Sequence, residues 1–432
     1  MSEWRNCLIG DVAEIIGGGT PSTTNKENYG GDISWITPKD LSGHKEMYIS
    51  KGERSITRNG LENSSARLLP VNSILFTSRA PIGYIALAKN ELSTNQGFKS
   101  LILKADNNPK FFYYLLKQIT PKIESYASGS TFEEISGNFL SKIPIKIPTS
   151  NVQKKIGEFI ETFDKKIELN KQTNINLENI AASLFKSWFI DFDPVKAKVK
   201  GHSSGLPNQI SDLFPNSFEK TELGDVPYGW EICTLGDLVD LEKKAVTPND
   251  SPKEIFYHYS IPAYDEGMIP SQDIGNSIKS NKFLITKGVF MISKLNPSLP
   301  RFWLPSISNS KRSISSTEFL VCRPKEIVGI PYAYYLTKSS KILRQMKSMA
   351  TGTSSSHQRL RPIDFSSITS IRPNKKLFDV YSGYISPILE KLLLNREQNI
   401  ILSSYRDSLI PKLITGELEI SDIEKKVKEV DL

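Results

Sequence analysis

The sequence predicts a mixed α/β (α+β) protein in which two pseudo-twofold related globular domains are separated by two long antiparallel coiled-coil helices. Three observations predict this fold class. The chain has 432 residues, which is too long for one ordinary hydrophobic core. Much of its first half recurs about 225 residues later, and each half ends in a heptad pattern of apolar residues.

The internal repeat is carried by short anchors, between which the two halves diverge strongly. The anchors are "WRNCLIGDVAEI" (4–15) with "WEICTLGDLVDL" (230–241), "FFYYLL" (111–116) with "YAYYLT" (332–337), and "SYASGST" (125–131) with "SMATGTS" (348–354). This pattern predicts one backbone frame that is duplicated and two different sets of side chains that fill it. Two equivalent halves in one chain favour a pseudo-twofold axis, which would run the two long helices antiparallel.

Each predicted long helix has a seam of apolar residues at alternating steps of four and three, which is typical of a coiled coil. Pro387 lies in the first turns of the second helix and predicts a kink or a late start there. The predicted seam residues are Ile160, Phe163, Ile167, Asn170, Asn174, Leu177, Leu184, Trp188, Ile385, Ile388, Leu392, Asn395, Asn399, Leu402, Leu409 and Leu413.

Two asparagines fall at the same two steps of each seam. Buried polar seam residues can fix the register and pairing of helices at a cost in stability. Alternatively, the asparagines line a site for a ligand or a partner. We favour the first interpretation and keep the second open.

The sequence divides into six predicted segments, and the globular ones contain short predicted strands and helices. Short β-branched or aromatic runs, namely "SWIT", "SILFTS", "GYIALA", "KSLIL", "VFMIS" and "EFLVC", predict strands. Residues 108–119 and 331–346 each predict a helix, with Pro109 in the first turn of the former. The predicted boundaries are 1–150 and 226–373 for the globular domains, 151–189 and 374–415 for the long helices, 190–225 for a Pro/Gly/Ser-rich connector and 416–432 for a tail.

Composition and charge narrow the function. Hydrophobic residues make up 38% and charged residues 24%, as in a folded soluble protein. The net charge of +8 and the pI near 9.0 favour an anionic partner, most commonly nucleic acid. The three cysteines and four histidines lack metal-ligand spacing. The start has no signal peptide and no run is long enough to span a membrane, so we expect a cytoplasmic protein.

Catalytic motifs are absent from the sequence. It contains no GxxxxGK[ST] phosphate loop, no Pro-Pro-aromatic tetrapeptide of adenine methyltransferases and no recognisable Ser-His-Asp arrangement. "GGGT" at 17–20 lacks the GxGxxG pattern, and we interpret it as a tight turn rather than a phosphate cradle. We therefore expect no catalytic residue, cofactor or metal site.

Several segments together resemble the specificity (S) subunit of type I restriction–modification enzymes, in the right order and over nearly the whole chain. They are "EIIGGGTPS" (14–22), "ASGST" (127–131), "SLFKSWFIDFDPVKAK" (183–198), "GLPNQISDLFPNSFEKTELGDVPYGWEI" (205–232) and "SLIPKLITGELEI" (408–420). The second half departs from the first, since "EKKAVTPNDS" has no triple glycine, so the two domains belong to different recognition subtypes.

The resemblance implies a non-catalytic host-defence subunit with two target-recognition domains, each of which reads one half of a split double-stranded DNA sequence. It implies that the two helices set the spacing and dock two adenine-N6 methyltransferase (M) subunits, and that motor-nuclease (R) subunits join this core. S-adenosylmethionine, ATP and Mg would belong to those partner subunits, and none would be bound by this chain.

Loops of the two domains offer polar side chains for reading base edges, since Arg or Lys suits guanine and Asn or Gln suits adenine. Each candidate has a second interpretation as a solvated loop residue or a turn former. The candidates are Arg79, Asn95, Gln96, Lys99, Ser130, Thr131, Lys294, Asn296, Arg301, Thr353, Ser355, His357, Gln358 and Arg359.

Two alternatives stay open. The chain could be the recognition subunit of another modification or defence system, which the neighbouring genes would reveal. It could instead be a coiled-coil scaffold that binds only protein. The scaffold predicts little affinity for duplex DNA and no salt-dependent binding even with a methyltransferase present.

Overall fold

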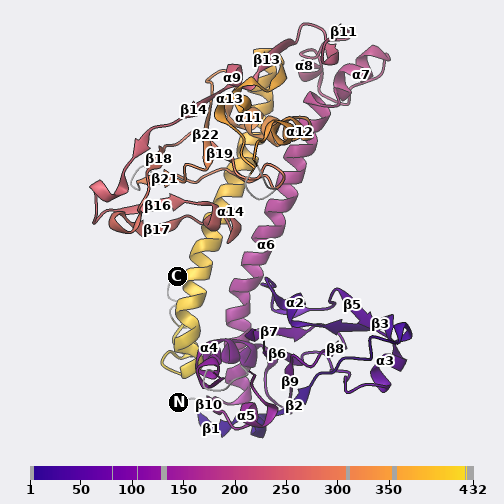
Figure 1. The fold of residues 1–432 in the computed structure, drawn as a ribbon, viewed down its shortest axis with the longest axis vertical. Helices are drawn as coiled ribbons and strands as arrows, with labels where there is room; N and C mark the ends of the chain where they lie inside the picture. The colour runs from indigo at the N-terminus through magenta and orange to yellow at the C-terminus, as the bar shows by residue number, and fades with distance from the viewer. Residues whose placement is uncertain are drawn as a thin grey trace. The chain divides into compact units, whose positions relative to one another are not determined.

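Figure 1 shows the fold of the chain, which is a computed structural model. The structure describes residues 4–79, 81–104, 106–127, 134–307, 312–352, 358–423 and 425. The chain divides into two compact units, the first formed by residues 1–168 and 401–432 and the second by residues 169–400. Both units combine helices with several small sheets, which confirms the mixed α/β class.

The first unit contains a five-stranded sheet in the order β2 (Ala13–Gly17), β9 (Lys99–Leu103), β6 (Ile74–Ser78), β7 (Ile82–Ala88) and β4 (Tyr48–Ile49). Its neighbours pair antiparallel except β4, which runs parallel to β7. Two smaller sheets consist of β5 (Arg54–Ile56), β3 (Tyr29–Ile36) and β8 (Ser93–Thr94), and of β1 (Arg5–Leu8) and β10 (Pro144–Ile147).

Helix α4 (Pro109–Ala127) packs against β7 of this sheet. Pro109 is its first residue, where the missing N–H would have no partner inside the helix anyway. Its aromatic residues Phe111 and Phe112 are fully buried in the core of the first unit. The short helices of this unit are α1 (Ile9–Val12), η1 (Lys26–Asn28), α2 (Pro38–Leu41), α3 (Arg58–Glu62) and α5 (Gly137–Ser141).

The second unit has a four-stranded sheet and a five-stranded sheet. The first has the order β14 (Val239–Glu242), β22 (Phe319–Pro324), β19 (Phe290–Ser293) and β20 (Phe302–Trp303). The second has the order β15 (Ala245–Val246), β18 (Lys282–Ile285), β21 (Ser313–Ser315), β16 (Ile255–Tyr259) and β17 (Ser271–Ile274). A two-stranded sheet pairs β13 (Glu231–Thr234) with β23 (Thr369–Arg372), as β1 pairs with β10 in the first unit.

The helices of the second unit correct one prediction. The segment 331–346 forms two helices, α11 (Gly329–Lys338) and α12 (Ser340–Met349), because Ser339 between them has an extended backbone. The remaining helices are α9 (Leu235–Leu238), η2 (Pro248–Asp250), α10 (Ile261–Asp265), η3 (Gly275–Ser277) and α13 (Pro362–Ser367).

The predicted connector is folded. It contains α7 (Asp193–Val199), α8 (Asn208–Ser211) and a hairpin of β11 (Phe218–Thr221) and β12 (Gly224–Pro227). Val195 and Phe214 lie fully buried in the core of the second unit. Since burial of such a side chain stabilises a fold by about 1.5–3 kcal/mol, this segment contributes to the core rather than only linking the halves.

Two long helices, α6 (Ser150–Phe189) and α14 (Lys375–Thr415), each begin in one unit and end in the other. Pro387 lies inside α14, so the predicted late start is wrong. A proline here removes the hydrogen bond to the carbonyl of Gly383, and both residues are exposed to solvent, which can satisfy that carbonyl.

Within the second unit, α6 and α14 run antiparallel beside each other (Figure 1). The four seam asparagines join them. Asn170 Nδ2 donates to Asn399 Oδ1 at 2.8 Å, and Asn395 Nδ2 donates to Asn174 Oδ1 at 2.8 Å. Further along the pair, the Tyr381 hydroxyl donates to the carbonyl of Ala181. All the predicted seam residues are buried or half-buried. Paired amides of this kind fix one register, because a shift would leave buried polar groups without partners.

Candidate nucleic-acid interface

Three loop segments of the first unit meet beside the end of β6. Ser78, the last residue of β6, donates its backbone N–H to the carbonyl of Gly97 at 2.8 Å. Its own carbonyl accepts from the N–H of Ile135 at 2.9 Å. These two bonds tie the segments 78–79, 95–99 and 134–135 together, and we call this arrangement the first junction.

The second unit contains the same arrangement beside the end of β19. Lys294 donates its backbone N–H to the carbonyl of Glu318 at 2.8 Å, and its carbonyl accepts from the N–H of Leu360 at 3.0 Å. We call the segments 294–296, 317–320 and 358–360 the second junction. Two sheets with different side chains thus bring their loops together by one pair of backbone hydrogen bonds.

The first junction brings four of the predicted DNA-binding residues together. Arg79 and Lys99 lie on either side of Glu134, with Arg79 Nη1 3.6 Å from Oε2 and Lys99 Nζ 3.3 Å from Oε1. Asn95 Oδ1 accepts from the N–H of Gly97 at 3.0 Å, and Gln96 Oε1 accepts from the hydroxyl of Thr20. The other two predicted residues of this domain, Ser130 and Thr131, lie outside the described residues.

The second junction brings together Lys294, Asn296, Gln358 and Arg359. Asn296 has a left-handed backbone, with φ of 50°, and its N–H donates to the carbonyl of Gln358 at 2.8 Å. Arg359 Nε donates to Glu318 Oε2 at 3.0 Å. Thr353, Ser355 and His357 lie outside the described residues.

Arg301 lies next to this junction but is paired elsewhere. Its carbonyl accepts from the N–H of Ser293, the residue before Lys294. Its guanidinium binds Asp265 with two bonds, from Nε at 2.7 Å and from Nη2 at 2.9 Å. The side chain is mostly buried, so this bidentate pair holds it away from open solvent.

The electrostatics differ among these cations. Burial lowers the pKa of the Lys294 ammonium, although Glu318 opposes that effect. The hydrogen bond that Arg359 donates to Glu318 raises the pKa of the Arg359 guanidinium. Both junctions therefore combine a cation, a carboxylate and amide groups at the surface of a sheet. Side chains of these types can bind phosphates and base edges.

Comparison with known proteins shows the family to which the chain belongs. A family model described as the type I restriction modification DNA specificity domain matches residues 1–179. The chain is 32% identical over 433 residues to the type I restriction enzyme MjaIX specificity subunit of Methanocaldococcus jannaschii, covering 98% of this chain and 95% of that relative. The chain belongs to the family of type I restriction enzyme specificity subunits.

A second member of the specificity-subunit family is similar over its whole length. This is the HindI specificity subunit of Haemophilus influenzae, which is 25% identical over 97% of this chain and 100% of the relative. The crystal structure of the type I restriction-modification system S subunit from M. genitalium has a TM-score of 0.58 at 18% identity, covering 95% of this chain and 96% of that chain. This structural likeness shows the shared fold.

The residues that sequence reasoning missed in this family member are the carboxylates Glu134, Glu318 and Asp265. Each is paired with a predicted DNA-binding cation. Glu134 and Glu318 do not occupy corresponding positions. Ile135 and Leu360 correspond in the two frames, so Glu134 corresponds to Arg359, while Glu318 corresponds to Gly97. Local sequence patterns gave no signal for these pairs, because the partners come from separate loops.

The glycine segment 17–20 corrects another expectation. It is an extended exit from β2 rather than a tight turn, and its glycines are required by close packing. A Cβ on Gly18 would lie 1.9 Å from the carbonyl oxygen of Asn95, and one on Gly19 would lie 2.2 Å from the nitrogen of Ala66. The N–H groups of Gly18 and Gly19 donate to Phe98 and Thr94 carbonyls. They are therefore not directed at a phosphate.

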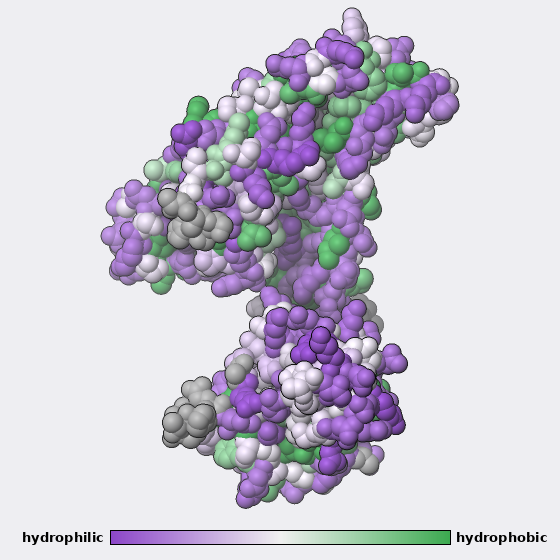
Figure 2. Space-filling model, turned by 45° about the vertical axis from the view of Figure 1, so that its right-hand side comes forward, coloured by the Kyte–Doolittle hydropathy of each residue, from purple (hydrophilic) through white to green (hydrophobic). Residues whose placement is uncertain are grey.

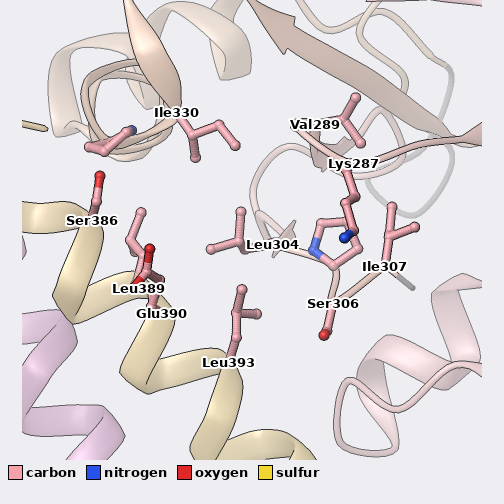
Figure 3. Close-up of a pocket in the computed structure, with 13 residues that line it drawn as sticks. Lys287, Val289, Leu304, Ser306, Ile307, Ile330, Ser386, Leu389, Glu390 and Leu393 are labelled. Atoms are coloured by element: carbon pink, nitrogen blue, oxygen red, sulfur yellow. The ribbon is translucent and has the colours of Figure 1, made fainter. Parts of the chain in front are cut away.

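A cavity of about 480 Å³ lies within the second unit, between α14, the first turn of α11 and the segments that precede β19 and follow β20 (Figure 3). Leu389 and Leu393 of α14 face Leu304 across it, and its charged lining residues, Lys287 and Glu390, lie on opposite sides (Figure 3). Its lining combines these apolar side chains with the hydroxyl residues Ser306 and Ser386.

The described part of the chain contains no cluster of three His, Cys, Asp or Glu side chains that could hold a metal ion. In the same residues no helix is long and apolar enough to cross a membrane. The visible face of the molecule is largely hydrophilic, with small scattered apolar areas (Figure 2).

Proposed function

We propose that this chain is the DNA-recognition subunit of a type I restriction–modification complex and that each globular domain reads one half of a bipartite target. The observation that carries the proposal is the pair of junctions. They share the same two backbone hydrogen bonds but present Glu134, Arg79 and Lys99 in one case and Glu318, Arg359 and Lys294 in the other. One frame with two sets of polar side chains suits two different half-sites.

The long helices set the spacing between the half-sites in this proposal. The asparagine pairs support it, because they disfavour any other register of α6 on α14. A fixed register gives a fixed separation, so the target should have a gap of constant length. Phosphate contacts by Lys and Arg side chains of this chain, whose net charge is +8, would add salt-dependent affinity without sequence preference.

Exposed apolar residues on the helices are the docking surface that we propose for two adenine-N6 methyltransferase subunits. The set is repeated at an interval of 225 residues: Leu169, Ile175 and Ile180 on α6 correspond to Leu394, Ile400 and Tyr405 on α14. Every member is at least 39% exposed. An apolar surface that occurs twice suits a partner that is present twice.

The chain itself supplies no chemistry in this proposal. S-adenosylmethionine would bind to the methyltransferase subunits, and ATP and Mg would bind to the motor-nuclease subunits that join the complex. The work of this chain is to select the DNA sequence and to hold the enzymes over it. Its relatives are named specificity subunits, which supports this division.

A single-molecule map of N6-methyladenine tests the proposal in a host that expresses the partner methyltransferase, with and without this gene. We expect deletion to remove methylation from one split motif with two different half-sites and a fixed gap. If no motif disappears while the methyltransferase is expressed, the chain does not determine DNA specificity. Binding of the methyltransferase without DNA binding would then favour the protein scaffold.

A further inference from the structure

In each junction, a carboxylate forms an ion pair with the basic side chains that we expect to contact DNA. In the first junction one carboxylate, Glu134, lies between two cations, Lys99 and Arg79. In the second junction Glu318 binds Arg359 and also lies near the half-buried ammonium of Lys294. Both domains thus have an ion pair at the junction. The carboxylate and the cation, however, come from different positions of the shared backbone frame in the two domains.

The geometry of these pairs makes them replaceable. All four side chains at the closest contacts remain partly exposed, from 20% for Lys99 to 53% for Arg359. Ion pairs at such exposure are weak, because water screens them. An incoming acceptor with good geometry can therefore take over the N–H groups, as the O6 and N7 atoms of guanine do for an arginine.

A carboxylate at this position acts differently on two kinds of DNA contact. It repels a phosphate, which carries the same charge, and it competes with the phosphate for the same cation. A base edge carries no net charge, so the carboxylate does not repel it as it repels a phosphate, and a correctly placed edge offers two directed hydrogen bonds. Specificity can arise from such a repulsive element as well as from attraction.

We propose that Glu134 and Glu318 are specificity-determining residues that compete with DNA for Arg79, Lys99 and Arg359 and so weaken binding to non-cognate sequences. This inference rests on the proposed function, since it concerns the same two junctions. The carboxylates hold the cations in place in the free protein. They release them when a cognate half-site supplies better acceptors.

The test compares Glu134→Gln and Glu318→Gln in the full chain bound to its methyltransferase. Glutamine keeps the shape of the side chain and removes its charge. Each variant should bind a non-cognate duplex about two- to fivefold more tightly, as expected for the loss of one partly exposed charge interaction. Cognate binding should change less, and the methylation map should gain sites that differ from the motif at one base of the affected half.

Matched controls are Glu62→Gln in the first unit and Glu254→Gln in the second. These residues form the ion pairs Arg58–Glu62 and Arg312–Glu254, whose members belong to none of the junction segments. They should leave the ratio of cognate to non-cognate binding unchanged. An equal gain in non-cognate affinity in the controls would show a general charge effect and would overturn the inference.

Thermal melting establishes that each variant is folded, and Glu134→Ala and Glu318→Ala replace any glutamine variant that is not. A ratio of cognate to non-cognate binding equal to that of the wild type would overturn the inference, as would equal losses of both affinities, which indicate a merely structural pair. These failures differ from failure of the proposed function. In that case the wild-type chain itself would direct no motif.

Discussion

In both recognition domains, a tyrosine of a repeated helix binds a carboxylate on a long helix. The carboxylates do not come from corresponding positions of the repeat. In the first unit the Tyr114 hydroxyl of α4 donates to Asp164 Oδ2 at 2.5 Å, and Arg406 Nη1 donates to Asp164 Oδ1 at 2.6 Å. In the second unit the corresponding Tyr335 of α11 donates to Glu178 Oε2 at 3.3 Å. Lys338 Nζ donates to that same oxygen at 2.7 Å.

Both carboxylates come from α6, although an exact repeat would place one on each long helix. The position on α14 that corresponds to Asp164, 225 residues later, is Leu389, which is buried in the core of the second unit. Duplication has therefore kept the chemistry of the contact, a tyrosine and a cation on a carboxylate, and has changed its position. The difference teaches that the frame tolerates relocation of a contact provided that the buried hydroxyl keeps an acceptor.

The largest expected effect is a loss of stability that is confined to the first unit, because only the first domain has the triple-glycine segment. Gly18→Ala or Gly19→Ala should destabilise the first unit by about 3 kcal/mol, because a Cβ would overlap backbone atoms of Asn95 or Ala66. Gly17→Ala is the matched control, since its Cβ would meet nothing within 4 Å. Hydrogen exchange should show the loss in the first unit alone. Equal stability of all three variants would contradict the packing argument.

Removal of the two carboxylates tests the comparison directly. Asp164→Ala and Glu178→Ala should each cost about 2 kcal/mol, because each leaves a cation and a mostly buried tyrosine hydroxyl without their acceptor. Hydrogen exchange should locate the first loss in α4 and the second in α11. The exposed Glu158 on α6 provides the control variant, Glu158→Ala. The contacts would not be equivalent if one variant proved neutral.

The asparagine pairs should give a smaller effect on stability and a clear effect on register. Asn395→Ala should cost about 1–2 kcal/mol, since it leaves the half-buried Asn174 Oδ1 without its donor. Replacing both Asn174 and Asn395 by leucine should instead raise the melting temperature and relax the register. Crosslinks between cysteines on α6 and α14 would report that register, with Ser404→Ala on the exposed face of α14 as control.

The smallest expected effect is a difference in acid sensitivity. Burial lowers the pKa of His258, although its hydrogen bond to Asp273 opposes this. The unfolded chain therefore binds this proton more readily than the folded chain, and the second unit should lose stability as the pH falls through the ordinary histidine value near 6.5. This loss should be the smallest of the effects described here. His258→Gln should remove it, and an unchanged pH profile in that variant would contradict the assignment.

The long helices and many strands could be predicted because their constraints are local. A seam that recurs at steps of four and three indicates a helix with one buried stripe, and two asparagines at the same steps of each seam indicated a fixed register. The pairing of Asn170 with Asn399 is a finding of the structure. The runs "SILFTS" and "KSLIL" became β6 and β9 because β-branched residues between turn formers suit strands.

The candidate site could be predicted only as a set of loops. Arg79 and Lys99 were named from their chemistry, but their shared partner, Glu134, follows from hydrogen bonds between loops far apart in sequence. The "GGGT" segment was misinterpreted for a related reason. Glycine can be required by backbone angle or by lack of space, and only the tertiary neighbours Asn95 and Ala66 show that space decides.

The placement of both carboxylates, Asp164 and Glu178, on α6 has a consequence for the exchange of recognition domains by recombination. Recombination could copy the coding sequence of one recognition domain into the place of the other. The incoming helix would then carry the same pair of tyrosines and the same lysine. These are Tyr113, Tyr114 and Lys117 in the first domain and Tyr334, Tyr335 and Lys338 in the second. The receiving position would already offer an acidic acceptor, Asp164 or Glu178. New combinations of half-sites could thus arise in one genetic step, without prior adaptation of the helices.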